Sequence, residues 1–540
     1  MSGFIGELFA GSLRMDILES VAESAPRPEF EALTERLGRF LSEEIRPGEI
    51  DAAGEFPPEL LARLRELGLF ALRIPAEYGG LGLSAPEYGQ LLTLLARRDG
   101  SLAAMLFGHN SLGVVEPLLR RGRAEQKRAF LPRAAAGAIG AFALSEAEAG
   151  SDPARMQAAV RRTPEGDYVL DGEKLWTTNA PIADFVFVVA KGPEEGGFTA
   201  FVVETRRPGV SVGPRTRLLG LRALPIAPMS FRAVKLSAAE RLGAEGEGLT
   251  TALDCLARAR NLLPSVSFGA IAACVAAARE WTGRRVQGGR ALGGHEAPAL
   301  RLAELEAASF AARALAGLTR RSAQREGAGL ALDGAAAKVF ASEWAWRIAD
   351  EAAQLGGARG LESESSQVAR GEAPLGLERL LRDARLGRIF GGSNEILRLL
   401  LGRAALGPHR RAAAGGTWAR LGLLGRYASW WLEGFLPRAC PGKGEMAGHL
   451  RFAAGAARRL ARAVFHAELV HGSELMLRQG TLLRFADIAI EIYAMAAAAL
   501  EARRVGASQI HQAELFCRGA RRRVGRIFCD LASNDDALAR

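Results

Sequence analysis

The chain of 540 residues is long enough for several domains with cores of ordinary size. Hydrophobic residues make up 49% and charged residues 24%, as in ordinary globular proteins, and no uninterrupted apolar run has the length of a membrane-spanning helix. The net charge of +10 favours anionic partners, among them phosphorylated cofactors, acidic lipid headgroups and nucleic acid, although charge alone identifies none of them.

The first twenty residues, MSGFIGELFAGSLRMDILES, lack a basic region, and Glu7, Arg14 and Asp16 interrupt their apolar character. We therefore expect no secretory signal and an intracellular protein, cytoplasmic or peripheral on the inner membrane face. The cysteines lie far apart without a CxxC pair, which argues against a zinc site or a disulfide framework. Reduced, mostly buried thiols are expected at Cys255, Cys274, Cys440, Cys517 and Cys529.

After an N-terminal arm (1–26), residues 27–137 repeat apolar side chains at spacings of three and four, which predicts a helical domain. From 138 to 243 the pattern changes to short β-branched and aromatic runs between glycine or charged turns. Examples are GDYVLDGEKLWTTN and ADFVFVVAK. This pattern is typical of antiparallel strands and predicts a middle β domain.

Helical periodicity returns in residues 244–403, whose long apolar segments, such as AAAKVFASEWAWRIADEAAQLGG, are typical of helices that bury against one another in a bundle. A break at GPHRRAAAGGTWAR (407–420) precedes a last helical region, and we assign 404–540 to an extra C-terminal helical domain. The expected fold class is therefore α+β multidomain, with an N-terminal helical domain, a middle antiparallel β domain, a helix bundle and an extra C-terminal helical domain.

Two polar stretches, ALSEAEAGSDPARM (143–156) and EKLWTTNAPIAD (173–184), lie beside the first predicted strands. Ser145, Ser151 and Thr178 offer hydroxyl groups, and Trp176 offers a flat apolar face, a set suited to a planar cofactor with polar edges. The alternative is an exposed turn beside a core tryptophan.

The same two stretches resemble the flavin-contacting segments of the acyl-CoA dehydrogenase family. Further matches are LGLFALRIPAEYGGLGLS, GHNSLG, EQKRAFLPRAAAG, LGAEGEG and LLRDARLGRIFGGSNEILRL. The opening SGFIGELFAGSL and the C-terminal LMLRQGTLLRFADIAIEIYAMAAAAL are similar to the very-long-chain branch, whose members carry an added helical domain. The resemblance covers roughly residues 3–530 and implies the family's fold.

The resemblance implies FAD as cofactor. It places contacts at Leu144, Ser145, Ser151, Trp176, Thr178, Arg285, Gly356 and Gly357, with Arg285 reaching FAD across a subunit contact. A homodimer at least is therefore expected. The chain departs from the family pattern at Gly288 (usually phenylalanine), Ala353 (glutamine) and Ala147 (proline), which weakens the expectation of tight FAD binding. Arg260 matches an arginine of the acyl-CoA site.

The family's reaction needs a base for the α-proton of the thioester, hydrogen-bond donors for the enolate oxygen and a flavin to accept hydride from the β-carbon. The base position of most members is Gly391 in this chain, and the other position used in the family is Ala259. Neither holds a carboxylate. Gly391 keeps its backbone N–H, which we expect to donate to the thioester carbonyl at the entrance of a helix that begins at Ser393 or Asn394, after an apolar strand-like tripeptide at 388–390.

Glu395 and Asp254 are the nearest substitutes, but Glu395 matches a residue that the family carries alongside its base, and Asp254 lies out of register. Three explanations stay open: a displaced base, a catalytically weakened homologue kept for binding or assembly, and a local alteration of this chain.

In the C-terminal domain, ARLGLLGRYASWWLEGFLPR (419–438) combines Trp430, Trp431 and Phe435 with Arg420, Arg426 and Arg438. Its apolar residues at spacings of three and four, flanked by arginines, predict attachment to an anionic membrane surface. The alternative is a helix packed within the domain or across a dimer. RGARRRVGR (518–526) is interpreted as a solvated helix face, because no aromatic platform or nucleic-acid-binding module accompanies it.

The predicted function is FAD-dependent α,β-dehydrogenation of long-chain or very-long-chain acyl-CoA in β-oxidation, with electrons passed to an electron-transferring flavoprotein. The first rival is a catalytically weak FAD- or acyl-CoA-binding scaffold that docks a membrane complex. The second is flavin chemistry on a different substrate. No nucleic acid and no metal site are expected.

Overall fold

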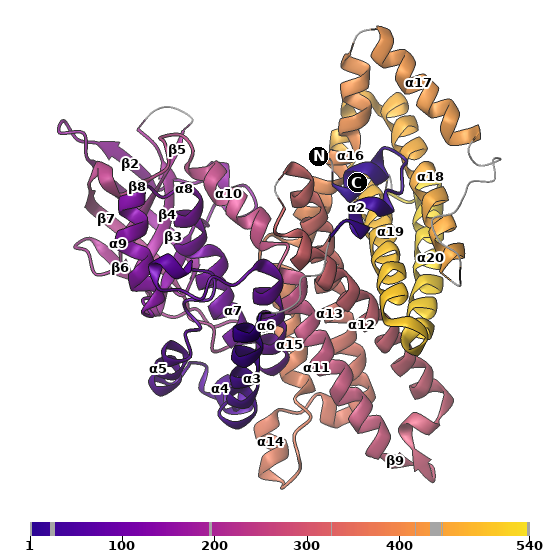
Figure 1. Ribbon diagram of the computed structural model, residues 1–540, viewed down its shortest axis with the longest axis horizontal. Coiled ribbons are helices and arrows are strands. Elements are labelled where there is room, and N and C mark those ends of the chain that lie inside the picture. Colours follow the sequence, from indigo (N-terminus) through magenta and orange to yellow (C-terminus); the bar gives the residue numbers. More distant parts are fainter. Residues whose placement is uncertain are drawn as a thin grey trace. The chain divides into compact units, whose positions relative to one another are not determined.

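The computed structural model describes residues 3–21, 27–193, 197–325, 327–415, 417–432, 444 and 446–536 (Figure 1). The chain forms two compact units. The sheet unit consists of Ala25–Ala259 and Leu361–Leu386, and the helical unit consists of Met1–Ser24, Arg260–Gly360 and Gly387–Arg540.

The sheet unit begins with helices whose apolar stripes face one another, as the spacing predicts. Ser84 caps one of them, α6. Its hydroxyl accepts a hydrogen bond from the Glu87 N–H, and the Glu87 carboxylate accepts one from the Ser84 N–H, which completes a capping box. The helices are α3 (Pro28–Glu43), α4 (Pro47–Ala53), α5 (Pro58–Glu66), η1 (Ala76–Tyr78), α6 (Ala85–Arg98), α7 (Gly100–Phe107), η2 (Gly108–Leu112), α8 (Val115–Arg121), α9 (Ala124–Ala135), α10 (Gly248–Ala259), α14 (Glu364–Ala369) and α15 (Leu377–Gly387).

An eight-stranded sheet forms the middle of this unit, in the order β6-β7-β3-β1-β4-β5-β8, with β2 paired to β3 and β4. Most pairs are antiparallel, as predicted. The exceptions are β1, which runs parallel to β4, and β2, which makes one parallel bridge to β4. The strands are β1 (Gly140–Ala143), β2 (Ala159–Arg162), β3 (Tyr168–Thr178), β4 (Phe185–Lys191), β5 (Phe198–Glu204), β6 (Val210–Val212), β7 (Ile226–Leu236) and β8 (Arg241–Leu242), with short turns η3 (Pro153–Arg155), η4 (Ala180–Ile182) and η5 (Ala238–Glu240).

The β4 strand, FVFVVAK, is buried on both faces, which explains its unbroken apolar sequence. Phe185, Phe187 and Val189 pack under α8 and α9, whereas Val186 and Val188 enter a second core enclosed by the strands. The strand therefore anchors the neighbouring β1, whose end carries the first flavin-like segment.

The helical unit is a bundle in which α11, α12 and α13 pack against one another. Of these, α12 and α13 also pack against the added helix α19, and α12 packs against the added helix α20. Its elements are α1 (Phe4–Phe9), α2 (Met15–Glu19), α11 (Leu263–Arg284), β9 (Val286–Gln287), β10 (Arg290–Ala291), η6 (Leu292–Gly294), α12 (Glu296–Ser322), α13 (Ala328–Gly356), η7 (Gly357–Gly360), α16 (Asn394–Ala414), α17 (Thr417–Leu432), α18 (Ala447–His471), η8 (Gly472–Leu477), α19 (Gln479–Val505), η9 (Gly506–Gln509) and α20 (Ile510–Ala532). The expected order of helical, β, bundle and extra helical parts is confirmed.

The predicted break at 407–420 is confirmed only in its middle, because α16 continues through Pro408 to Ala414 and α17 begins at Thr417. Proline removes one backbone hydrogen bond, but buried Leu401, Ala405 and Leu406 hold the helix against its neighbours. At Gly402, α16 and α19 approach so closely that a Cβ atom would lie 2.4 Å from the carbonyl oxygen of Leu482. The added helices are thus packed directly onto the bundle.

Two stretches, 100–121 and 248–284, have the length and hydropathy of a membrane-spanning helix. Both are interrupted: the first at Gly113 and Val114 between η2 and α8, the second at residues 260–262 between α10 and α11. Cys255, Cys274 and Cys517 are buried free thiols, as expected, whereas Cys529 is exposed and Cys440 lies outside the described residues.

Candidate functional site

In the sheet unit, the two flavin-like segments meet where β1 and β3 end. Phe142 pairs with Thr178 across the antiparallel ladder. Just beyond, the Ser145 carbonyl accepts a 2.8 Å hydrogen bond from the Leu175 N–H. Leu144, Ser145, Trp176 and Thr178 are therefore brought to one end of the sheet, and Ser151 lies exposed in the loop that follows β1.

The hydroxyl groups of Ser145, Ser151 and Thr178 make no hydrogen bond to any residue that the structure describes. Side-chain hydroxyls near a sheet end normally find a protein partner or water. Donors and acceptors left open at this sheet end fit the polar edge of a bound cofactor such as FAD.

Trp176 adopts a left-handed backbone conformation, with φ of 54°, that is rare for a large residue. A register shift between Lys174 and Thr177 in the β3–β7 ladder produces it. The indole is 52% exposed and is therefore no core tryptophan. Backbone strain of this kind gathers at ligand sites, so the bulge presents a flat apolar surface beside the open hydroxyl groups.

A buried ion pair that sequence reasoning missed holds the two segments together. Lys174 Nζ lies 2.7 Å from Glu146 Oε1 and 3.2 Å from the Leu144 carbonyl oxygen. The Glu146 carboxylate also accepts from the backbone N–H of Ala158 at 3.1 Å. Burial lowers the pKa of Lys174, and Glu146 opposes that shift. The signal in the sequence was limited to one opposite charge in each flavin-like segment, Glu146 in 143–156 and Lys174 in 173–184.

In the helical unit, Arg285 caps the end of α11 and stacks on Trp281, its guanidinium 5.8 Å from the ring centroid. Arg359 of η7 stacks on the same ring at 5.7 Å. The β9–β10 hairpin follows, and its turn residues Gly288 and Gly289 have φ of 58° and 79°. A phenylalanine at 288 would be strained there, which gives a local reason for this departure from the family pattern.

Gly356 and Gly357 mark the end of α13, where Gly357 takes φ of 59° and ψ of −142°, a region open chiefly to glycine. Ala353, in the last turn of α13, is buried, and a Cβ atom on Gly360 would lie 2.1 Å from its carbonyl oxygen. Because Arg285 and Arg359 share Trp281, the end of α13 and the end of α11 are adjacent.

The segment 388–393 is a turn before α16. The predicted strand-like character of 388–390 is wrong, since α15 ends one residue earlier and no strand partner follows among the described residues. The predicted helix start is confirmed, with Ser393 as N-cap. Gly391 has φ of 71°, and a Cβ atom there would lie 2.5 Å from Leu263 Cδ1. The backbone at this position is therefore one that favours glycine.

Two cationic side chains, the buried Lys338 and the partly buried Arg260, bind the carbonyl groups of the turn. Arg260 Nε donates to the Gly391 oxygen at 2.8 Å, and Lys338 Nζ donates to the Gly392 oxygen at 2.8 Å. Lys338 also donates to Asn394 Oδ1 at 2.8 Å. Burial lowers the pKa of Lys338 to about 7, and the positive charge of Arg260 adds to the shift. Arg260 and Gly391, both predicted, are thus brought together, whereas Lys338 was missed.

The carboxylate in contact with the start of α16 is Glu343, which accepts from Asn394 Nδ2 at 2.9 Å and from Arg398 at 3.1 Å, and pairs with Arg388 at 3.2 Å. Burial alone would raise the pKa of Glu343, but these donors hold it below its usual range. An ionised, fully engaged carboxylate has a structural role here. Arg398 continues the network to Asp487 of α19 at 2.7 Å.

The two substitute bases lie elsewhere. Glu395 is exposed in the first turn of α16. Asp254, in the sheet unit, pairs with Arg120 at 3.7 Å and Arg258 at 3.5 Å.

The predicted membrane segment corresponds to α17, and its residues 433–438, with Phe435 and Arg438, lie outside the described residues. Trp430 was wrongly placed on the exposed face: it is 5% exposed and packs against His409 and Tyr427. Adjacent positions point about 100° apart on a helix, so Trp431 faces outward instead. The exposed apolar face of α17 consists of Trp418, Leu421, Leu424, Trp431 and Leu432.

Three family descriptions match consecutive parts of the chain. Residues 27–138 match the acyl-CoA dehydrogenase N-terminal domain, residues 141–234 the acyl-CoA dehydrogenase middle domain, and residues 246–406 the acyl-CoA dehydrogenase C-terminal domain. The matches follow the order of the observed fold.

Similar proteins extend the match past residue 406. The "Probable acyl-CoA dehydrogenase FadE10" of Mycobacterium tuberculosis is 38% identical over 564 residues, 99% of this chain and 87% of that one. The mitochondrial very long-chain specific acyl-CoA dehydrogenase of Homo sapiens is 29% identical over 90% of this chain and 77% of its own length. A crystal structure of a Bacillus anthracis acyl-CoA dehydrogenase complexed with FAD superposes with a TM-score of 0.84 at 25% identity, covering 100% of this chain and 94% of that one.

Proposed function

The chain belongs to the acyl-CoA dehydrogenase family, and from this premise we propose that it catalyses the FAD-dependent α,β-dehydrogenation of long-chain or very-long-chain acyl-CoA in β-oxidation. The single observation that carries the proposal is the sheet end where the unpartnered hydroxyl groups of Ser145 and Thr178 lie with the strained, exposed Trp176, since this arrangement has little structural use without a bound flavin. The family uses FAD, and the residues present fit it.

When bound, FAD supplies an acceptor for the hydride that leaves the β-carbon. The chain's own residues provide the remaining parts. Ser145, Ser151 and Thr178 offer hydrogen bonds to the cofactor's polar edge, and Trp176 offers its indole face. Arg285, Gly356 and Gly357 mark the family's cofactor positions in the helical unit, and a homodimer would let Arg285 serve the partner subunit.

At the turn, Arg260 and Lys338 fix the carbonyl groups of Gly391 and Gly392 at 2.8 Å each, which orients the peptide units before α16. In this proposal the Gly391 N–H donates to the thioester carbonyl, where the start of a helix favours developing negative charge. No carboxylate stands at the family's base positions, so the α-proton leaves more slowly than in relatives that keep the base.

A weak homologue with a binding or assembly role is the second candidate, and a specific observation favours it. Gly391 has a φ of 71°, and Leu263 occupies the space that a Cβ atom on Gly391 would need. The turn therefore favours glycine over a residue whose side chain could act as the base. In that case FAD or acyl-CoA would be bound without turnover.

The deciding experiment follows the flavin absorption of the purified protein anaerobically while palmitoyl-CoA is added. Rapid bleaching supports the dehydrogenase, with an electron-transferring flavoprotein as the acceptor to test next. A flavin that stays oxidised supports the weak homologue, and a protein that takes up no FAD contradicts both.

The paired variants G391E and G391E/L263A then test the missing base. If its absence limits the rate, dehydrogenation rises by roughly 10²- to 10⁴-fold, most clearly in the double variant, because the smaller residue makes room beside the new side chain. Unchanged rates in folded variants would show that the base is not what limits this enzyme.

We also propose that the protein is intracellular and binds peripherally to a membrane. The exposed apolar face of α17 supports it, because two tryptophans and three leucines are an unusual outward surface for a helix whose opposite face is already buried. The double variant W418S/L421S should lose vesicle binding while retaining the spectrum of bound flavin.

A further inference from the structure

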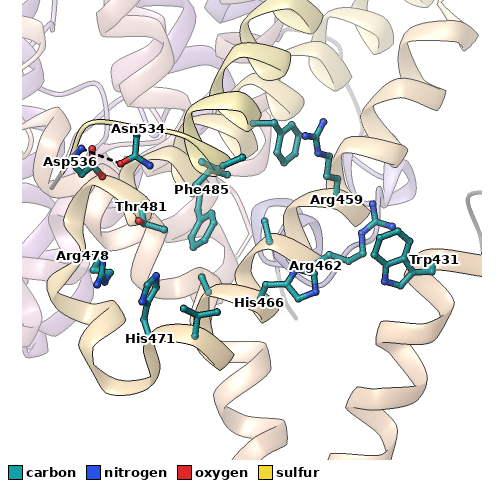
Figure 2. A pocket seen from close by; sticks show the side chains of 16 residues that line it. Trp431, Arg459, Arg462, His466, His471, Arg478, Thr481, Phe485, Asn534 and Asp536 are labelled. Carbon is teal, nitrogen blue, oxygen red and sulfur yellow. Dashed lines mark hydrogen bonds between the residues drawn. The ribbon is translucent and has the colours of Figure 1, made fainter. Parts of the chain in front are cut away.

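A groove of about 700 Å³ lies in the added C-terminal helices, among the end of α17, α18, the start of α19 and the end of α20, with Arg478 at the junction of η8 and α19. We call it the C-terminal groove. Figure 2 shows Arg459, Arg462 and Trp431 at one end, Arg478 at the other and Phe485 between them. It is lined by a different part of the helical unit from the turn at Gly391.

The charge of this groove is unbalanced. Arg459, Arg462 and Arg478 form no ion pair within the described part of the chain. The acidic lining residue, Asp536, is already engaged, because both of its oxygens lie 2.7 Å from the guanidinium of Arg484. Arg462 and Arg478 are partly buried and Arg459 is exposed, and three guanidinium groups without a carboxylate partner around one groove are suited to anions from outside the chain.

Two of these arginines are held in place by aromatic rings. The Arg459 guanidinium lies 4.1 Å from the Phe528 ring centroid, and that of Arg462 lies 4.1 Å from the Trp431 centroid. Arg462 also donates to the Trp430 carbonyl at 2.8 Å. Stacked guanidinium groups lose little freedom when a phosphate binds, and their remaining N–H donors suit its oxygens.

The groove opens beside exposed apolar surface. Trp431 belongs both to the groove and to the exposed face of α17. At the other side, Val470 lines the groove at 74% exposure and lies next to Leu469, which is also exposed. Unpaired arginines between exposed apolar residues are complementary to a surface with negative charge above hydrocarbon, as at the boundary of an anionic bilayer.

We propose that the C-terminal groove binds the anionic headgroups of phospholipids when the face of α17 lies on a membrane. This inference rests on the proposed membrane association and adds the site that would recognise the anionic headgroups. A free phosphate or fatty-acid anion shares the charge but lacks the surface that the apolar residues would cover.

The test measures sedimentation of the full-length protein with vesicles of phosphatidylcholine alone and with about one quarter phosphatidylglycerol, at fixed ionic strength. The groove variant is R459Q/R462Q/R478Q. The matched control is R451Q/R522Q/R526Q, which removes the same charge from exposed arginines of α18 and α20 outside the groove. We expect binding to anionic vesicles to weaken on the order of 100-fold in the groove variant and about threefold or less in the control.

Equal weakening in both variants would overturn the inference, because net charge rather than the groove would then attract the membrane. The variant R459K/R462K/R478K guards against loss of structure: it keeps the charge and should bind more tightly than the glutamine variant. Equal binding by the two would count against the proposal.

Three further results separate the possibilities. If W418S/L421S abolishes vesicle binding but the groove variant does not weaken it, membrane association stands and the headgroup inference fails. If the parent protein binds no vesicle of either composition, both fail. If glycerol phosphate or palmitate is bound in solution by the parent and lost in the groove variant while vesicles are not bound, the groove takes a soluble anion and the lipid proposal is wrong.

Discussion

The ammonium group of Lys338, buried within α13, lies 2.8 Å from the carbonyl oxygen of Gly392. The same group reaches Asn394, so one side chain links the turn to the first residue of α16. We expect K338M to lower the free energy of unfolding by about 1 to 3 kcal/mol, because the Gly392 carbonyl loses its Lys338 donor and Asn394 Oδ1 keeps only Ser342, while the cost of burying a charge is relieved. Denaturant unfolding measures this, and dehydrogenation should fall with it. K235M, at an exposed lysine of β7, is the control, and a K338M variant as stable as the parent would contradict the role.

Glycine at 391 is required by the backbone. G391A should destabilise the protein by about 1 to 2 kcal/mol, because an L-residue with a φ of 71° is strained. Adding L263A removes the 2.5 Å approach to Leu263 Cδ1 but leaves the strain, so the double variant should not recover the loss. G283A, in α11 where an added Cβ meets nothing within 4 Å, should be neutral or slightly stabilising in the same thermal unfolding series.

The Lys174–Glu146 pair should control flavin retention. Removing one partner of a buried pair leaves an uncompensated charge, so K174M should lose about 3 to 5 kcal/mol of stability. E146Q/K174M keeps an acceptor for the Ala158 N–H without that charge and should be more stable than K174M alone. The ratio of flavin to protein absorbance after desalting should fall in K174M, since the Leu144 carbonyl loses its donor. If the stability losses of K174M and of the single variant E146Q add up to the loss in E146Q/K174M, the pairing is contradicted.

Asp333 should make stability depend on pH in an unusual direction. Its carboxylate accepts from the N–H groups of Phe4 and Ile5 at 3.0 Å and 2.9 Å, and burial raises its pKa to about 6. Because the folded state binds this proton more tightly than the unfolded state, the stabilisation is complete below about pH 4 and is lost as pH rises through about 6.

Because the pKa of Asp333 rises from 3.8 to about 6, its contribution to the unfolding free energy changes by roughly 3 kcal/mol at most. Other carboxylates with lowered pKa have the opposite pH dependence, so the useful quantity is the difference in unfolding free energy between the parent and D333N. That difference should fall from pH 4 to pH 7, and a flat difference would contradict the assignment.

Local patterns predicted the elements well, because apolar spacing reports burial directly. Ser393 and Asn394 marked the start of α16 through the preference of short polar residues for helix starts. Arg388–Phe390 failed because an apolar tripeptide fits a strand or a buried turn equally, and only the tertiary environment decides.

The candidate site was predicted only where residues lie in the quoted motifs. Lys338 stands alone in an apolar helical run, so nothing in its neighbours indicates that it reaches a carbonyl group 54 positions away. Trp430 and Trp431 looked equivalent in sequence, but one is packed on His409 and the other faces outward. Such distinctions depend on helix rotation relative to neighbours, which periodicity in one segment does not fix.

The close approach of α16 and α19 at Gly402 has a consequence for nonsense mutations. A premature stop codon after residue 415 would remove Leu482, whose backbone occupies the space beside Gly402, and Asp487, the partner of Arg398. The truncated product would keep every residue of the matched family domains yet expose the buried stripe of α16 around Leu397 and Leu401 to water. Such alleles should therefore lead to aggregation or degradation of the whole polypeptide rather than to a shorter working enzyme.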